Sequence, residues 1–155
     1  MDIYKRLEEL GLKLPVLPKP LASYEPATVY QNIVFTSGQL PIVNQELKYR
    51  GKVGKDLTVE EAKEAAKICI LNCLAAVHNV LGDLNKVEKV IKVTGFVNSS
   101  PDFIHQPAVI EGASTLLIDL FGETGKHARS AVGVAALPND VAVEIEIMIS
   151  IKSSY

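Results

Sequence analysis

The sequence predicts an α+β fold, a single sheet built in the order β-β-α-β-α-β-β with two long helices on one face. Apolar residues recur with the 3.6-residue period of a helix over 58–81 and 107–121. They alternate with other residues, as in strands, over 28–36 and 127–149, and the run 87–97 is apolar on both faces. The connections are short, and crossovers are right-handed. Both facts favour an antiparallel or mixed sheet that carries its long helices together.

The composition indicates one globular domain. A chain of 155 residues can bury a core, and 48% hydrophobic with 22% charged residues is ordinary for such a chain. We assign 1–155 to a single domain, with an N-terminal helix and extended crossing at 1–22 and a core at 23–155. Cys69 and Cys73 have no second ligand pair nearby, so we interpret them as buried thiols rather than as a metal or redox pair.

The charge balance argues against a broad basic surface. The net charge is −2, and lysines and arginines are interspersed with acids. Extended contact with nucleic acid or an anionic membrane is therefore not expected. No uninterrupted apolar run reaches the roughly 18 residues of a membrane span, and the charged N-terminus does not resemble a secretory signal. We expect a cytoplasmic location.

The N-terminal part is expected to hold a short helix, an extended crossing and two strands. Apolar residues have helical spacing over 2–10, and three prolines between 15 and 20 favour an extended path. A tight turn at Gln31 joins two strands within 28–36. The polar, lysine-rich segment 42–57 is interpreted as a flexible loop, with a basic lid over a substrate as the alternative.

Both long helices have clear start and stop signals. Thr58 and Glu61 have the spacing of a capping box at the start of the first, and Gly82 ends it. Pro107 fits the first turn of the second helix, which Gly122 ends.

The final region, 127–149, holds the residues that are chemically most informative. Two alternating runs flank a turn at 137–140, which predicts a β-hairpin. Arg129 lies in the first run, and Glu144 and Glu146 lie on the polar face of the second. An arginine fork binds a planar carboxylate, and a carboxylate can hold a water or move a proton. The alternative is that Arg129 pairs with Glu144 or Glu146 as a structural ion pair.

The two helices can cover only one face of the sheet. The other face carries Ala, Gly, Val and Met side chains beside Arg and Glu, which is too apolar for one large exposed patch. Self-association is the simplest way to bury such a face. We therefore expect a closed homo-oligomer with sites where subunits meet.

Three segments carry a resemblance to a known family: 32–41, with the sequence NIVFTSGQLP, then 87–103, then 128–146. Together they span roughly 24–151 and resemble the Rid family (YjgF type), whose members were also called L-PSP endoribonucleases or translation inhibitors. The resemblance implies a chorismate-mutase-like (ferredoxin-like) fold and a homotrimer with three clefts between subunits. It also implies hydrolysis of reactive enamines or imines, such as 2-aminoacrylate, to 2-oxo acids and ammonia, without metal or cofactor.

The resemblance also suggests roles for individual residues. Arg129 resembles the family arginine that grips the substrate carboxylate, and Glu144 resembles the acid that positions the attacking water. Tyr24 corresponds to a tyrosine that lines the cleft, and Ser37 and Gly38 correspond to a loop that contacts the ligand. The chemistry is consistent with these roles, because an imine is already electrophilic and needs only an anchor and a held water.

Other positions depart from the family pattern. Ser114 matches, by helical register, an asparagine on the helix before the arginine. His127 stands where the family often has proline. It either faces the cleft and binds substrate or is an exposed loop residue, and we favour the second interpretation. Ala131 replaces a frequent cysteine. These departures indicate a divergent subgroup.

Two alternatives to an imine deaminase stay open on the sequence alone. A non-catalytic module would use Arg129 to hold a small carboxylate and would regulate or protect a partner. The older family label implies an endoribonuclease. The acidic balance, the absence of a basic aromatic stripe and the wide separation of His78, His105 and His127 in the sequence count against that activity.

Overall fold

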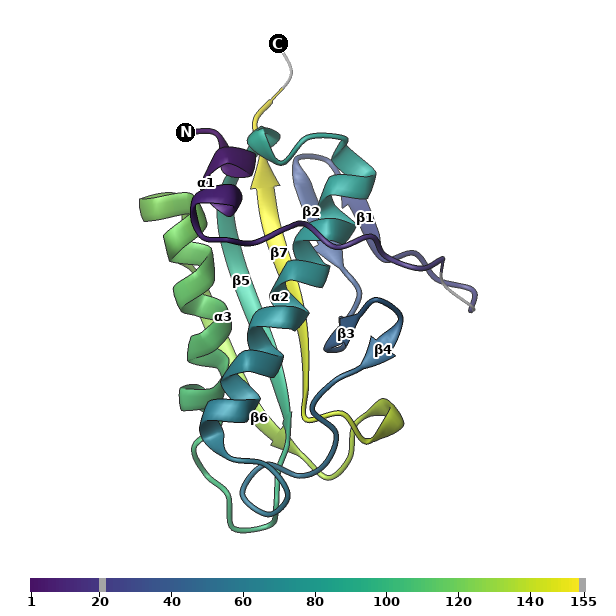
Figure 1. Cartoon of the computed structure of the whole chain (residues 1–155). Helices are drawn as coiled ribbons and strands as arrows, with labels where there is room; N and C mark the ends of the chain where they lie inside the picture. Colours follow the sequence, from purple (N-terminus) through teal and green to yellow (C-terminus); the bar gives the residue numbers. More distant parts are fainter. Residues whose placement is uncertain (20–21, 154–155) are drawn as a thin grey trace.

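The structure is a computed structural model that describes residues 1–19 and 22–153 (Figure 1). Positions 20 and 21, near the end of the predicted crossing, lie outside the described residues. The elements in chain order are α1 (Ile3–Glu9), β1 (Ala27–Tyr30), β2 (Ile33–Thr36), β3 (Ile42–Val43), β4 (Glu46–Leu47), α2 (Val59–Leu81), η1 (Leu84–Lys86), β5 (Val87–Asn98), α3 (Gln106–Phe121), η2 (Gly122–Gly125), β6 (Ala128–Val134), η3 (Pro138–Asp140) and β7 (Val143–Ile151).

A five-stranded sheet in the order β1-β2-β7-β5-β6 forms the centre of the fold. Strands β5 and β6 are parallel, and the other neighbours are antiparallel. Helices α2 and α3 lie side by side on the same face of the sheet (Figure 1). The predicted α+β class, the mixed sheet and the placement of both long helices are confirmed.

The predicted hairpin over 127–149 is wrong. Strand β6 does not pair with β7. It pairs with β5 in parallel at the edge of the sheet, whereas β7 lies between β2 and β5. The physical reason is the apolar face of β7, on which Val143, Ile145 and Ile149 are fully buried. An apolar strand buries more of its surface, and so stabilises the fold more, in a central position with a neighbouring strand on each side.

The helix signals read from the sequence are confirmed. The Thr58 hydroxyl accepts from the backbone N–H of Glu61, and the Glu61 carboxylate accepts from the backbone N–H of Thr58, each at 3.2 Å. Gly82 ends α2 in the left-handed conformation. By length and composition α2 could cross a membrane, but more than half of its most apolar stretch is buried here, as in the core helix of a folded domain.

Both cysteines are buried between α2 and the sheet, as predicted. The Cys69 and Cys73 thiols donate to the carbonyl oxygens of Val143 and Ile145 at 3.4 and 3.2 Å. Burial raises the pKa of the Cys73 thiol to about 12. The thiol therefore stays protonated and has a packing role.

The segment 42–57 has more regular structure than the expected flexible loop. It begins with the β3–β4 hairpin, and its cations contact the protein itself. The Lys52 ammonium donates to Asn98 Oδ1 at 2.9 Å, and Arg50 Nε donates to the Asn139 carbonyl oxygen at 3.0 Å. Lys52 thus ties the segment to the end of β5, and Arg50 ties it to η3.

Strand β5 contains register shifts between Val87 and Lys89 and between Val90 and Lys92. Val90 and Val93 are consequently both fully buried, three positions apart. Strict period-two alternation over 87–97 would place Val90 and Val93 on opposite faces, and the register shifts break that alternation. A β-bulge of this kind bends the strand and re-aims its side chains.

Candidate functional site

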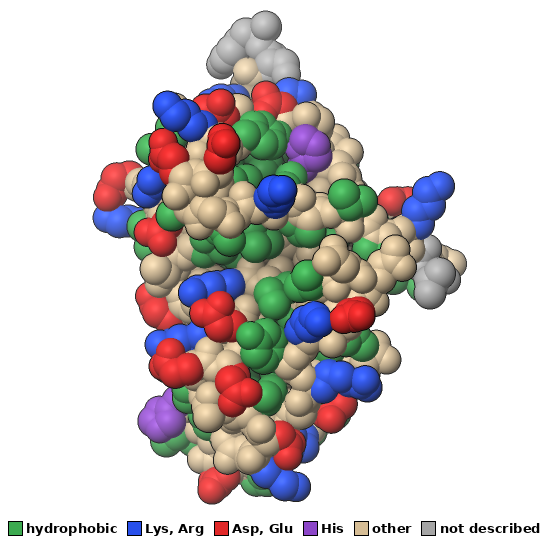
Figure 2. All heavy atoms as spheres, viewed as in Figure 1, with side chains coloured by type: hydrophobic (Ala, Val, Ile, Leu, Met, Phe, Trp, Pro, Cys, Tyr) green, Lys and Arg blue, Asp and Glu red, His purple; other side chains and the backbone are tan. Residues whose placement is uncertain are grey.

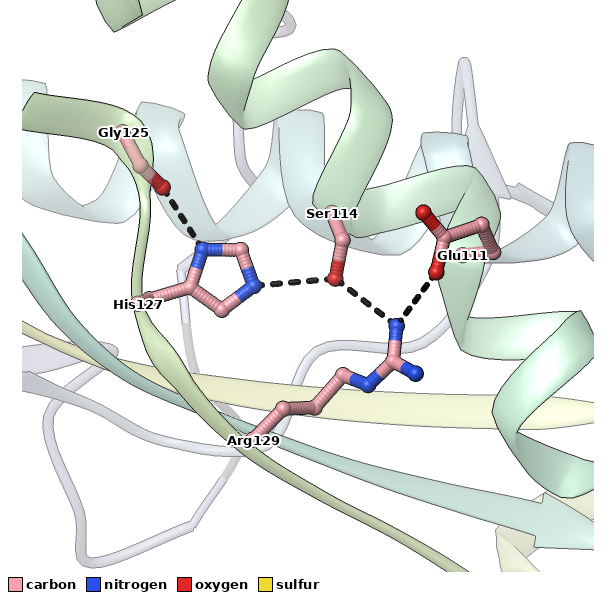
Figure 3. Close-up of polar contacts among 5 residues, drawn as sticks. All are labelled: Glu111, Ser114, Gly125, His127 and Arg129. Carbon is pink, nitrogen blue, oxygen red and sulfur yellow. Dashed lines mark hydrogen bonds and ion pairs between the residues drawn. The ribbon is translucent and has the colours of Figure 1, made fainter. Parts of the chain in front are cut away.

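Arg129 lies on the edge strand β6 and reaches toward α3, which packs against the same face of the sheet (Figure 3). Its Nη1 atom donates to Glu111 Oε2 at 2.8 Å and to Ser114 Oγ at 3.1 Å. The Arg129 side chain is 25% exposed and that of Glu111 is 54% exposed. One corner of the guanidinium is thus held by α3 while the group remains open to solvent.

A row of hydrogen bonds extends from Ser114 to the turn before β6 (Figure 3). His127 Nδ1 lies 2.6 Å from the Gly125 carbonyl oxygen, and His127 Nε2 lies 2.9 Å from Ser114 Oγ. A carbonyl oxygen can only accept, so Nδ1 carries the proton, and in the neutral ring Nε2 accepts from the Ser114 hydroxyl. Ser114 therefore donates to His127 and accepts from Arg129, which fixes the direction of every bond in the row.

These residues surround a shallow pocket of about 250 Å³, lined by Glu111, Ser114, Ile118, Lys126, His127 and Arg129. The interpretation of His127 as an exposed loop residue is wrong, because Ser114 and the Gly125 carbonyl hold its ring at the pocket wall. The alternative partner assignment for Arg129 is also wrong. Arg129 forms its ion pair with Glu111 of α3 and not with Glu144 or Glu146.

Glu144 lies elsewhere in the chain, opposite Phe96 in the β5–β7 register. Its neighbours Val143 and Ile145 are buried under the helices, so its side chain points to the uncovered face of the sheet. Partial burial raises the pKa of the Glu144 carboxyl, and the nearby charge of Glu146 raises it further. A carboxyl with a raised pKa is suited to accept and return a proton.

The loop after β2 packs directly on Glu144. A Cβ atom at Gly38 would lie 2.9 Å from Glu144 Cδ and 3.0 Å from its Oε1, so only glycine fits without displacing the carboxylate. Backbone bonds between Gln39 and Ile145, at 2.8 and 3.1 Å, hold the loop there. The Ser37 hydroxyl donates to the Glu25 carbonyl oxygen at 2.6 Å and so ties the loop to the segment before β1.

Tyr24 is 56% exposed and lies beside the same loop. Tyr24 and Gly38 line an open cavity of about 830 Å³. Its other walls come from the N-terminal crossing over 13–19, from the segment between Gln39 and Gln45, and from Leu71 and Asn72 of α2. The residues predicted as a site therefore form two groups within one chain. Arg129, Ser114 and His127 lie together at the β6 edge, and Tyr24, Ser37, Gly38 and Glu144 lie around the β2 loop.

Glu111 is the site residue that the sequence did not suggest. It lies three positions before Ser114, so both side chains are on neighbouring turns of one helix face. The sequence signal for Glu111 is its position as a charged residue beside the apolar stripe of the helix. Its role becomes visible only once β6 is known to run beside α3.

The three histidines have separate surroundings. The His78 ring accepts or donates at Nδ1 with the Tyr4 hydroxyl, His105 packs edge-on against Phe103, and His127 contacts Ser114. Positive and negative side chains are intermixed over the face shown in Figure 2, which is not the basic surface of a nucleic-acid binder. Among the described residues, no group of three or more His, Cys, Asp or Glu side chains lies close enough to hold a metal ion.

The fold and the site define a class of protein: an α+β domain with one uncovered sheet face, a polar pocket around Arg129 at the sheet edge and a carboxyl on the open face. The chain belongs to the family described as "YjgF/chorismate mutase-like, putative endoribonuclease", whose model matches residues 4–148. The resemblance to the Rid (YjgF-type) family read from the sequence is thereby confirmed.

Two curated relatives show the range of similarity. Protein TCP17 of Trypanosoma cruzi is 40% identical over 148 residues, which covers 95% of this chain and 92% of TCP17. A 2-iminobutanoate/2-iminopropanoate deaminase of Dermatophagoides farinae is 27% identical over 141 residues, covering 91% of this chain and 95% of the deaminase.

Solved structures agree with the fold. The protein Atu1372 of Agrobacterium tumefaciens is 46% identical, with a TM-score of 0.91 over 97% of this chain and 92% of its own. Escherichia coli TdcF, solved with bound serine, is 25% identical, with a TM-score of 0.60 over 88% of this chain and 93% of its own.

Proposed function

We propose that this protein hydrolyses reactive enamines and imines that carry a carboxylate, with 2-aminoacrylate as the model compound, to 2-oxo acids and ammonia. The observation that carries the proposal is the state of Arg129. Its bonds to the described residues use only Nη1, so the edge formed by Nη2 and Nε is available to a ligand. That edge presents two parallel N–H donors, the geometry that a carboxylate accepts best.

Similarity to known proteins supports the same chemistry. A relative at 27% identity bears the name 2-iminobutanoate/2-iminopropanoate deaminase, and TdcF was solved with serine, an amino acid with a free carboxylate. Both proteins match this chain over more than four fifths of their own length. The proposal transfers that class of ligand to the Arg129 pocket.

In the proposed mechanism the enamine tautomerises to the imine, and Arg129 holds its carboxylate. Glu144 accepts a proton from a water as the water adds to the imine carbon, which forms a carbinolamine. Glu144 returns this proton to the nitrogen and then carries the hydroxyl proton to the same nitrogen, so that the C–N bond breaks, ammonia leaves with the electron pair and the carbonyl forms. The substrate is already electrophilic, so positioning and proton transfer by one carboxylate are sufficient.

Within one chain Arg129 and Glu144 face opposite sides of the sheet, so one chain does not complete this site. We propose a homotrimer in which Arg129 of one subunit meets Glu144 of the next across a cleft. The apolar character of the uncovered face supports this arrangement, since Val132 on β6 is 45% exposed and Phe96 on β5 is only half-buried. A closed ring buries such a face without leaving a free copy of it.

The proposal is tested by following 2-oxo acid formation from 2-aminoacrylate that a serine dehydratase generates in the same vessel. Wild-type protein is expected to accelerate the step. Arg129→Ala is expected to lower kcat/KM about 100-fold because the carboxylate loses its anchor and the imine its position. Arg129→Lys keeps the positive charge but loses the two parallel donors of the guanidinium. Its kcat/KM is expected to lie between those of wild type and Arg129→Ala.

Arg50→Ala serves as the matched control. It also removes a cation, but one that bonds to the Asn139 carbonyl oxygen away from the pocket. Its activity is expected to equal that of the wild type. Equal rates for Arg129→Ala and wild type would remove Arg129 from the mechanism.

A second function is favoured by one observation, the separation of Arg129 from Glu144 within a chain. A protein that holds the carboxylate without a positioned water is a binding module. In the same assay such a module binds 2-oxo acids through Arg129 and leaves the rate of imine hydrolysis unchanged.

A further inference from the structure

We propose that Glu111 makes the Arg129 pocket selective for ligands with a single negative charge and weakens the binding of dicarboxylates. The inference deepens the proposed function and rests on it for the role of Arg129 as the carboxylate anchor. It assigns a specificity-determining role to a residue that neither the sequence pattern nor the mechanism above uses.

Glu111 lies directly beside the proposed anchor. Glu111 Oε2 lies 2.8 Å from Arg129 Nη1, and both side chains line the same shallow pocket. Glu111 already occupies one corner of the guanidinium, so a ligand carboxylate is left with the opposite edge. Any bound carboxylate therefore lies within one guanidinium width of a fixed carboxylate of the protein.

The charges of the pocket residues balance before a ligand binds. The Arg129–Glu111 pair is neutral as a unit, and the Lys126 ammonium at the rim is paired with Glu123 at 2.7 Å. The His127 ring is held by hydrogen bonds to Ser114 and to the Gly125 carbonyl oxygen and forms no ion pair with a described carboxylate. A monocarboxylate brings this pocket to one negative charge, and a dicarboxylate brings it to two.

Glu111 is dispensable for the fold. It is 54% exposed, and an exposed ion pair adds little to stability. Ser114 holds Nη1 of Arg129 independently at 3.1 Å, and α3 is anchored by its buried apolar stripe. Glu111→Gln should therefore remove the charge, keep an oxygen that accepts from Nη1 and leave the pocket in shape.

The experiment titrates the full-length protein with 2-oxobutanoate, a monocarboxylate, and with 2-oxoglutarate, a dicarboxylate, by calorimetry. Two unit charges about 6 Å apart, at a dielectric constant of about 20 to 80, change a binding constant roughly 3- to 100-fold. We expect wild-type protein to prefer 2-oxobutanoate about tenfold or more. In Glu111→Gln both ligands should bind more tightly, because each anchors a carboxylate beside residue 111, and the preference should fall severalfold because the second carboxylate of 2-oxoglutarate is also relieved of repulsion.

Two further variants isolate the cause. Glu64→Gln makes the same change in net charge by breaking the Lys67–Glu64 pair on α2, and its ligand preference should equal that of the wild type. Glu111→Asp keeps the charge on a shorter side chain and should keep most of the preference.

The outcomes separate the two proposals. An unchanged ligand preference in Glu111→Gln, with 2-oxobutanoate still bound through Arg129, overturns the role of Glu111 and leaves the proposed function intact. A shifted preference in a protein without imine hydrolysis supports the role of Glu111 and contradicts only the catalytic part. Failure of both ligands to bind any variant contradicts the anchor and the selectivity together.

Discussion

At the scale of single residues, the candidate site depends on two charged groups held in different ways. Arg129 is fixed at one corner by Glu111 and Ser114 and open at the other edge. Glu144 lies half-buried beside Gly38 and near a second carboxylate, Glu146. Its burial and the charge of Glu146 both raise its pKa. The first arrangement suits an anchor for an anion and the second suits a proton acceptor.

The raised pKa of Glu144 has a consequence for stability. Ionising this carboxyl is harder in the folded than in the unfolded chain, so the protonated form favours folding. That contribution is complete below the ordinary value of 4.5 and is lost as the pH rises through the higher folded-state pKa. Glu144→Gln removes the cost of ionisation and should raise Tm relative to wild type at neutral pH, with the difference disappearing in acid.

Calorimetric melting of both proteins from pH 4 to pH 8 measures this difference. The same variant should lose imine hydrolysis, since Gln cannot accept the proton. A Tm difference that is independent of pH would show that Glu144 titrates normally in the folded protein.

Part of the site could be predicted from sequence. The sequence suggested substrate-binding roles for Arg129 and Ser114 and gave such a role to His127 only as the less favoured alternative. The structure brings all three together around one pocket. Glu111 was missed because an exposed acid on a helix has no pattern of its own. The predicted ion-pair partner of Arg129 was also wrong. A hairpin would place β7, with Glu144 and Glu146, beside β6, whereas the neighbours of β6 are in fact β5 and α3.

At the scale of elements, the pocket depends on how closely α3 approaches α2. Gly112 lies between Glu111 and Ser114, and a Cβ atom built on it would lie 2.5 Å from the Lys63 carbonyl oxygen of α2. The contact is with backbone, which cannot move aside as a side chain tip does. Glycine at this point therefore sets the separation of the two helices and with it the position of the pocket wall.

Gly112→Ala should push the helices apart. Alanine improves helix propensity by about 1 kcal/mol, but overpacking against backbone costs about 1 to 3 kcal/mol or more. We expect a net loss of about 1 to 2 kcal/mol in the free energy of unfolding, measured by urea denaturation, and weaker binding of 2-oxo acids. Thr115→Ala, on the exposed side of the same helix, should change stability by less than about 0.5 kcal/mol. A Gly112→Ala protein as stable as wild type would show that the contact between α2 and α3 accommodates a methyl group without strain.

Element types were predictable here and strand neighbours were not. The capping box of Thr58 and Glu61 and the apolar stripes of both helices are local signals, and the structure confirms them. Period-two alternation assigns the faces of a strand but not the strands that lie beside it. The parallel pairing of β5 with β6 and the bulge near Val90 depend on contacts made across the whole sheet.

At the scale of the whole molecule, α1, α2, α3 and the crossing over 11–19 lie on one side of the sheet, as Figure 1 shows, and Glu144 and Phe96 lie on the other side. The proposed homotrimer gives that side a partner and joins the two groups of site residues into one cleft. The sequence pointed to an uncovered apolar face. The number of subunits that cover it is set by surface shape, which residue patterns do not encode.

The central claim is that Arg129 offers its free edge to a small carboxylate. The most direct measurement is a crystal structure of the full chain soaked with 2-oxobutanoate. The account predicts the ligand carboxylate on the Nη2 and Nε edge of Arg129, with Glu111 still on Nη1 and Glu144 of a neighbouring chain near the 2-oxo carbon. A ligand seated only in the cavity beside Tyr24, with Arg129 paired to Glu111 alone, would contradict it.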